Sequence, residues 1–113
     1  MSNKIRVKSS YEIITEESAR EGDVADRGWL NEEGELFDSA DEVVRHLRDK
    51  GVMEPSSSCF HRGVWYDTES TQNMHTGAYE SESYFIHGAT EGQERKIYKK
   101  LFPNYGDCNQ RRR

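Results

Sequence analysis

Cys59 and His61 are the side chains in this sequence whose types and spacing suit covalent catalysis. Two residues apart in an extended segment, they would point to the same side. A thiol beside an imidazole is an activated nucleophile when its pKa is lowered. The other interpretation is a serine-rich loop, Ser56–Ser58, that leads into a strand with Cys59 and Phe60 packed beneath it. We favour that structural interpretation and keep a small enzyme using Cys59 and His61 as an alternative.

The remaining metal-ligating residue types lack the spacing of a metal site. His46, His75 and His87 fall in a predicted helix, a loop and a strand end, and no second Cys or His pair stands at zinc-binding spacing. The acidic run at 23–34 has Ala25 and Arg27 at the third and fifth places of a calcium loop. We therefore expect no metal and no cofactor.

Two further classes of chemistry have no matching pattern. The sequence contains neither Gly-x-Gly-x-x-Gly nor a glycine-rich turn that ends in Gly-Lys-Ser/Thr, the two common phosphate-binding motifs. A hydrolase with paired carboxylates needs two acids at a fixed separation. Here the acids lie in a glycine-punctuated run, which is a poor scaffold for that geometry. We therefore predict that the protein is not an enzyme.

The acids themselves are concentrated in one segment. The net charge of the 113-residue chain is −5, yet residues 16–42 hold eleven Asp and Glu against Arg20 and Arg27. A field of this sign repels nucleic acid and attracts basic surfaces. Carboxylates spaced along a segment can imitate DNA phosphates, which follow one another at about 1.7 Å of duplex axis. The partner-binding residues that we predict are Glu16, Glu17, Glu21, Asp23, Asp26, Glu32, Glu33 and Glu35.

Basic residues are divided between several places, so direct binding of nucleic acid is disfavoured. Lys4, Arg6 and Lys8 share one face of a predicted strand, and Arg111–Arg113 end the chain. Aromatic residues do not interleave them in the sequence, as they do in many nucleic-acid-binding segments. A DNA-contacting patch on that strand face stays a minor alternative.

The elements that position these residues follow from periodicity and capping. Alternation predicts a strand over 4–16, and a long acidic connection over 17–37 follows, anchored to the core by Trp29, with a short hairpin over 29–37 as an option. Capping boxes and apolar stripes predict helices that begin after Ser39 and after Thr90. Strands are predicted over 63–69 and 79–87.

These elements define one small α+β fold. We expect a mainly antiparallel sheet of about three strands with two helices on one face, in the order β-α-β-β-α. The domain should cover residues 1–105, followed by a flexible basic tail over 106–113. No apolar run spans a membrane, the first residues lack a signal-peptide core, and two distant cysteines suit free thiols. We therefore expect a cytoplasmic protein.

Three stretches resemble small uncharacterised proteins carried by bacterial phages and plasmids: Tyr11–Ala19, Gly63–Glu69 and Gln93–Leu101. In size and acidity the chain is also similar to phage anti-CRISPR and anti-restriction proteins. This resemblance implies a non-enzymatic inhibitor of a host nucleoprotein complex and assigns no contact residue. The basic tail departs from a uniformly acidic mimic.

The sequence thus favours a non-enzymatic, acidic protein-binding module, for which an inhibitor that mimics DNA is one form. Its partner would be a basic protein surface, such as that of a nucleic-acid-binding protein in a bacterial defence system, and not a membrane. Two alternatives remain open. One is the small enzyme with Cys59 and His61, and the other is a homodimeric assembly module with exposed aromatics such as Trp65 or Tyr79 at its interface.

Overall fold

A computed structural model describes residues 4–54, 59–104 and 106–107. Its elements, in chain order, are β1 (Ile5–Ile14), α1 (Glu16–Arg20), β2 (Asp26–Phe37), α2 (Ala40–Lys50), β3 (Cys59–Phe60), β4 (Trp65–Asp67), β5 (Thr71–Gln72), β6 (Tyr79–His87), α3 (Glu91–Leu101) and β7 (Gly106–Asp107). The protein is α+β with an antiparallel sheet, as predicted. Within the described ranges the main sheet has five strands, however, and there are three helices.

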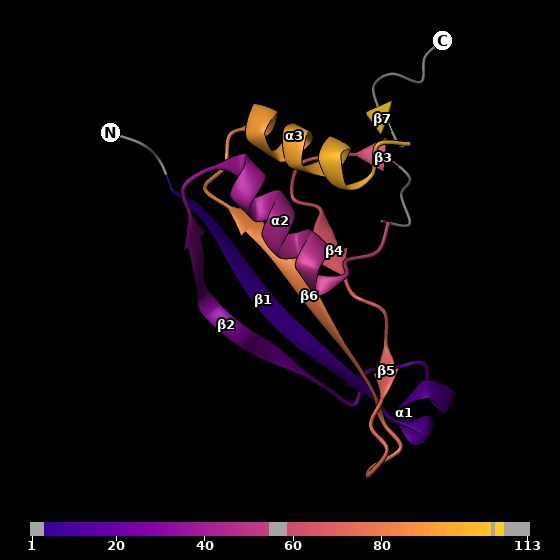
Figure 1. Cartoon of the computed structure of the whole chain (residues 1–113). Coiled ribbons are helices and arrows are strands. Elements are labelled where there is room, and N and C mark those ends of the chain that lie inside the picture. Colours follow the sequence, from indigo (N-terminus) through magenta and orange to yellow (C-terminus); the bar gives the residue numbers. More distant parts are fainter. Residues whose placement is uncertain (1–3, 55–58, 105, 108–113) are drawn as a thin grey trace.

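The main sheet has the strand order β2-β1-β6-β4, and the short β5 also pairs with β6. Every pairing in it is antiparallel. β2 is therefore a long edge strand, while β1 and β6 form the centre (Figure 1). A separate parallel pair joins β3 to β7, the first two residues of the predicted tail.

α2 and α3 lie side by side against the same face of this sheet (Figure 1). The residues of β1 and β6 that point toward the helices are buried, among them Ile5, Val7, Tyr84 and Ile86. From α2 the stripe Ala40, Val43, Val44 and Leu47 meets them, and from α3 Ile97 and Tyr98. The core therefore forms between the helices and one face of the sheet, and the alternation along β1 determines which side chains enter it.

Both long helices begin at the predicted caps. The Ser39 hydroxyl accepts a hydrogen bond from the Glu42 N–H, and Gly51 ends α2 in the left-handed conformation, with φ of 77°. The Glu42 carboxylate accepts from the Asp38 N–H, one residue before the expected donor. At α3, Thr90 and Gln93 make a complete reciprocal capping box. These local signals were sufficient to locate the helices.

The prediction for residues 17–37 was wrong, since most of this segment is not a loop. It contains α1 and the twelve-residue β2. β2 escapes detection because its register against β1 shifts twice, between Val7 and Ser9 and between Ser9 and Ser10, so apolar residues do not alternate. α1 is only five residues long and its capping box uses Ser18 in place of Glu or Gln. The element order therefore also differs from the predicted β-α-β-β-α.

Trp29 does not anchor this segment to the core. Its side chain lies on the sheet face opposite the helices and is 46% exposed. Its neighbour there is Trp65, at a centroid distance of 6.3 Å. The prediction failed because a large apolar residue was assumed to face the helices, whereas the pairing of Trp29 with Ser10 places it on the other side.

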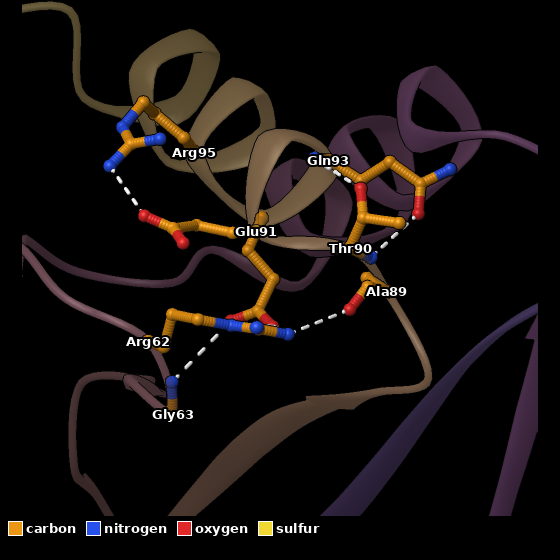
Figure 2. A network of polar contacts seen from close by, with 8 residues as sticks. Arg62, Gly63, Ala89, Thr90, Glu91, Gln93 and Arg95 are labelled. Atoms are coloured by element: carbon orange, nitrogen blue, oxygen red, sulfur yellow. Dashed lines mark hydrogen bonds and ion pairs between the residues drawn. The ribbon is translucent and has the colours of Figure 1, made fainter.

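The chain before β4 is held to the start of α3 by a polar network (Figure 2). Arg62 donates to the Glu94 carboxylate and to the Ala89 carbonyl. Glu94 is the only buried charged residue in the described part of the chain. Arg95 also stacks over the Phe60 ring, 5.1 Å from its centroid. These contacts attach the chain before β4 to helix α3.

Candidate partner-binding surfaces

The predicted partner-binding carboxylates all belong to α1, to the turn after it, or to β2. Glu16 and Glu17 lie on α1, and Glu21 and Asp23 follow it; Asp26, Glu32, Glu33 and Glu35 lie on β2. All eight residues are exposed. Because β2 is an edge strand, they follow one margin of the molecule and the end of the β1–β2 hairpin (Figure 1).

The eight carboxylates form two groups rather than one patch. The first, Glu16 to Asp26, gathers around α1, and the second, Glu32 to Glu35, lies toward the end of β2. Asp26 and Glu32 are six positions apart on β2, which corresponds to roughly 20 Å of extended chain. The second group is not uniform either, because Glu35 pairs across the sheet with Val7 and thus faces the helices.

These carboxylates differ from five other acids of the chain in how their charge is compensated. Elsewhere, carboxylates form ion pairs with lysine or arginine, as in Lys4–Asp38, Arg27–Glu12, Arg62–Glu94, Arg95–Glu91 and Lys100–Asp41. Among the described residues, none of the eight has such a partner. Glu35 approaches His46 at 4.0 Å, and Asp26 accepts from the Tyr11 hydroxyl at 3.2 Å. Their negative charge therefore remains available at the surface.

Asp41 shows how nearby lysines change the pKa of a carboxylate in this chain. The Asp41 carboxylate accepts from Lys100 Nζ at 3.0 Å and lies 3.7 Å from Lys96 Nζ. The hydrogen bond and charge of Lys100, followed by the charge of Lys96, lower the pKa of Asp41 below its ordinary value. A lowered pKa is the mark of a carboxylate whose charge is already stabilised within the molecule.

A second surface lies on the sheet face that α2 and α3 leave uncovered. Trp65 pairs across the sheet with Phe85, and their ring centroids are 5.0 Å apart. Trp29 reaches Trp65 from the other edge of the sheet. Trp65 is 42% exposed, so aromatic carbon faces solvent here. We call Trp29, Trp65 and Phe85 the aromatic trio.

Sequence reasoning named Trp65 as an exposed aromatic but missed its two neighbours. The missed signal is strand parity. Tyr84 and Ile86 are buried against the helices, so Phe85 between them must point to the opposite face. No comparable signal exists for Trp29, because the shifted register of β2 removes the alternation on which such an argument depends.

Of the three basic residues predicted to share a strand face, Arg6 and Lys8 lie on one face of β1 and Lys4 precedes the strand, and each has a different environment. Lys8 pairs across the sheet with Phe85, beside the aromatic trio. Arg6 donates to the Glu33 carbonyl, and Lys4 pairs with Asp38. Aromatic and basic side chains thus lie together in space although they are separated in the sequence. Arg111–Arg113 lie outside the described residues.

The catalytic alternative is not tested by the structure. The side chain of Cys59 lies outside the described part of the chain, so its distance to His61 is not defined, and Ser56–Ser58 and Cys108 lie outside it as well. His61 itself is exposed. Across residues 4–54 and 60–104, no group of three or more His, Cys, Asp or Glu side chains could hold a metal ion.

Fold and surfaces together define an α+β protein with one helix-covered and one open sheet face, and with an acidic edge. No helix in the described ranges has the length and apolar content needed to cross a membrane. Comparisons with protein-family models, with curated proteins and with solved structures gave no match.

Proposed function

We propose that this chain is a non-enzymatic protein-binding module whose acidic edge, α1 and β2, binds a basic surface on a partner. The observation that carries the proposal is the lack of compensation: the acids of this edge have no lysine or arginine partner among the described residues, whereas five acids elsewhere do. Charges left unpaired in a chain that pairs others are free for an external cation.

The partner that best fits this edge is a nucleic-acid-binding protein, and the module would inhibit it by occupying its basic channel. Glu32, Glu33 and Glu35 follow one another along an exposed strand, where residues rise about 3.3 Å each. Successive side chains of a strand alternate between its faces, so carboxylates on one face recur about 6.6 Å apart, roughly twice the 3.4 Å rise per phosphate along one DNA strand. A bacterial defence complex is one such partner, and the module would then act in the cytoplasm.

The division of the acids into two groups makes the proposal more specific. A partner that contacts both groups must span the length of β2, whereas a partner that contacts one group should ignore changes in the other. Reversal of Glu17 and Glu21 to lysine tests the group at α1. Reversal of Glu32 and Glu33 tests the group on β2.

A matched control is the reversal of Asp49 and Glu69, two exposed acids outside α1 and β2. All three double variants have the same net charge, so a loss of binding confined to the edge variants reflects position and not total charge. The wild type and the variants would be immobilised and exposed to bacterial lysate at low and high salt. Captured proteins would then be identified and purified.

The expected result is a protein that the wild type and the control capture at low salt, that an edge variant fails to capture, and whose binding to labelled duplex DNA the wild type inhibits. Circular dichroism must show that each variant is folded. Equal capture by the wild type and both edge variants would remove the proposal. So would capture of a protein whose DNA binding is unaffected.

A further inference from the structure

The centre of the open face of the main sheet contains two tryptophans. Trp29 on β2 and Trp65 on β4 belong to strands at opposite edges of the β2-β1-β6-β4 order. Between them lie Ser10 on β1 and Ser83 on β6, which pair with one another. Ser10 also pairs with Trp29, and Ser83 with Asp67, so these four residues form one row across the sheet. Because these serines are small, the two indoles approach to 6.3 Å above them.

A groove of about 540 Å³ runs along this row, with Ser10 and Ser83 among its lining residues and both tryptophans beside it. Tryptophan is among the residue types enriched at the positions that dominate binding energy in protein interfaces. Sheets in sandwich folds pack face to face at about 10 Å, with the side chains of both inner faces interdigitated. An open sheet face with an aromatic centre and a groove therefore suits a second sheet.

The charges around this centre are arranged symmetrically about Ser10. Lys8 and Glu12 are two residues before and two residues after Ser10 on β1, so all three side chains share the open face. A two-fold axis that crosses the strands above Ser10 exchanges these two positions. It places Lys8 of each copy opposite Glu12 of its mate, and it places the two Trp29 side chains opposite one another.

We propose that the open face of the sheet binds a second copy of this chain, through the aromatic trio and two reciprocal Lys8–Glu12 ion pairs. Lys8 and Glu12 then meet in two equivalent contacts, as an isologous interface requires, while Asp67, in the row of Ser10, lies opposite Asp67 of the mate. Lys8 has no ion pair with another described residue, so it is free to form one with a mate. Glu12 already contacts Arg27 at 3.5 Å, and it would bridge Arg27 and the mate's Lys8. This inference does not depend on the proposed function, because none of the eight partner-binding carboxylates takes part in it.

A single strand of nucleic acid is the competing occupant, since aromatic side chains on a sheet can stack on bases. The charges of the face argue against it. Glu12 and Asp67 both stand on the open face beside the tryptophans, and Arg6 is bonded to the Glu33 carbonyl. A channel for a phosphate backbone is lined with unpaired cations. This face instead has both signs, which a second copy matches.

The test uses a charge exchange between copies. Lys8→Glu gives a chain with two acids at the exchanged positions, and Glu12→Lys gives one with two lysines. Each variant alone should associate at least tenfold more weakly than the wild type, because like charges meet twice. An equimolar mixture should form a heterodimer near wild-type affinity. Both chains stay net acidic, so long-range attraction between them cannot produce this result.

Sedimentation velocity over a dilution series gives the masses, with 13.1 kDa for the monomer and twice that for the dimer. A second pair of variants tests the apolar centre. Trp29→Ala with Trp65→Ala should weaken association at least tenfold, while Leu30→Ala should not. Leu30 is a fair control because it is 51% exposed and lines grooves with Lys50 on the helix side.

A wild-type chain that stays monomeric at all concentrations overturns the inference, as does a mixture of the two charge variants that fails to associate. If the tryptophan variants do not fold, the charge exchange alone decides. A labelled (dT)20 oligonucleotide serves as the second probe. Tight binding of it by a monomer, with quenching of tryptophan fluorescence, would assign the face to single-stranded nucleic acid instead.

Discussion

Arg62 and Glu94 form a two-point ion pair: Nε and Nη2 of Arg62 lie 3.2 and 3.0 Å from the same carboxylate oxygen, Oε2. The other oxygen of Glu94 accepts from the Gly63 N–H at 3.4 Å, and Arg62 Nη2 also donates to the Ala89 carbonyl at 2.9 Å (Figure 2). The Glu94 side chain is only 10% exposed, whereas that of Arg62 is 54% exposed. Glu94 is therefore the buried acceptor on which the segment before β4 depends.

Glu94→Ala should lower the free energy of unfolding by about 1–3 kcal/mol, because the Gly63 N–H and the Arg62 guanidinium lose their shared acceptor. Glu94→Gln keeps the shape and one acceptor, so it should cost less. Urea unfolding measures both. Glu91→Ala is the control on the same helix turn, since its pair with Arg95 is exposed and such pairs contribute about 0.3–0.5 kcal/mol. Equal losses at the two positions would contradict this account.

Gly34 lies in β2 with φ of 84°, and a Cβ built there would stand 2.5 Å from Arg6 Cγ and 3.1 Å from the Val7 carbonyl oxygen. Gly22 has a similar φ of 73° but nothing within 4 Å of its Cβ position. Gly22→Ala should therefore cost only the left-handed strain, about 1–2 kcal/mol. Gly34→Ala should cost clearly more, because Arg6 and the β1 backbone must also shift.

Thermal unfolding of both glycine variants compares them directly. Similar melting temperatures would mean that the Arg6 side chain can move away from the new Cβ without loss of stability. The close approach of β2 to β1 at Gly34 would then be unimportant for stability.

These examples show which parts of the fold the sequence could predict. Helices with a capping hydroxyl and an apolar stripe, such as the one after Ser39, were located to within a residue, because cap and stripe are both local. β6 was predicted with its observed bounds, because Tyr79, Tyr84, Phe85 and Ile86 are residue types typical of strands. β2 was missed because its burial is slight and its bulges destroy the period of two.

The candidate binding surfaces also contain features that the sequence could predict and features that it could not. That the acids would be exposed followed from their type, but their separation into two groups follows from the path of β2, which was not predicted. The open aromatic face requires residues from three strands, Trp29, Trp65 and Phe85, whose register is set by tertiary pairing. Local sequence does not contain that register, so the adjacency of Lys8 and Phe85 could not be predicted either.

Thr90 and Gln93 should stabilise α3 through both halves of their capping box. The Gln93 N–H donates to the Thr90 hydroxyl at 3.1 Å, and the Thr90 N–H donates to the Gln93 side chain at 2.9 Å. Thr90→Ala should lower the free energy of unfolding by about 1 kcal/mol. Thr90→Ser retains the hydroxyl and is the matched control, for which little change is expected in urea unfolding. An equal loss in both variants would show that the methyl group of Thr90, and not its hydrogen bond, matters.

His46 should make stability depend on pH near neutrality. Its ring packs against Phe37, with centroids 4.8 Å apart, and edge-on against Tyr84 at 6.0 Å. Burial lowers the pKa of His46 below its ordinary value, and the charge of Lys50 lowers it further, while Glu35 and Asp49 oppose this shift. The folded protein therefore takes up the proton at lower pH than the unfolded chain, whose pKa is about 6.5.

The sign of the effect follows from proton linkage. Above the unfolded pKa both states hold a neutral imidazole, so the titration of His46 has no influence on stability there. As the pH falls through about 6.5, the unfolded chain binds the proton first, and the free energy of unfolding decreases. Urea unfolding at pH 7.5 and pH 5.5 should thus show a loss in the wild type that is smaller in His46→Gln, which cannot titrate.

Glu35→Gln separates the electrostatic cause from burial. Glu35 Oε1 lies 4.0 Å from His46 Nε2 and favours the protonated ring, so its neutral replacement should lower the pKa of His46 further. An NMR titration of the His46 ring protons measures this directly, and the loss of stability between pH 7.5 and pH 5.5 should increase in parallel. A His46 pKa that rises in Glu35→Gln would contradict the assignment, because removal of a nearby anion cannot favour a cation unless the ring has moved out of its pocket beside Phe37.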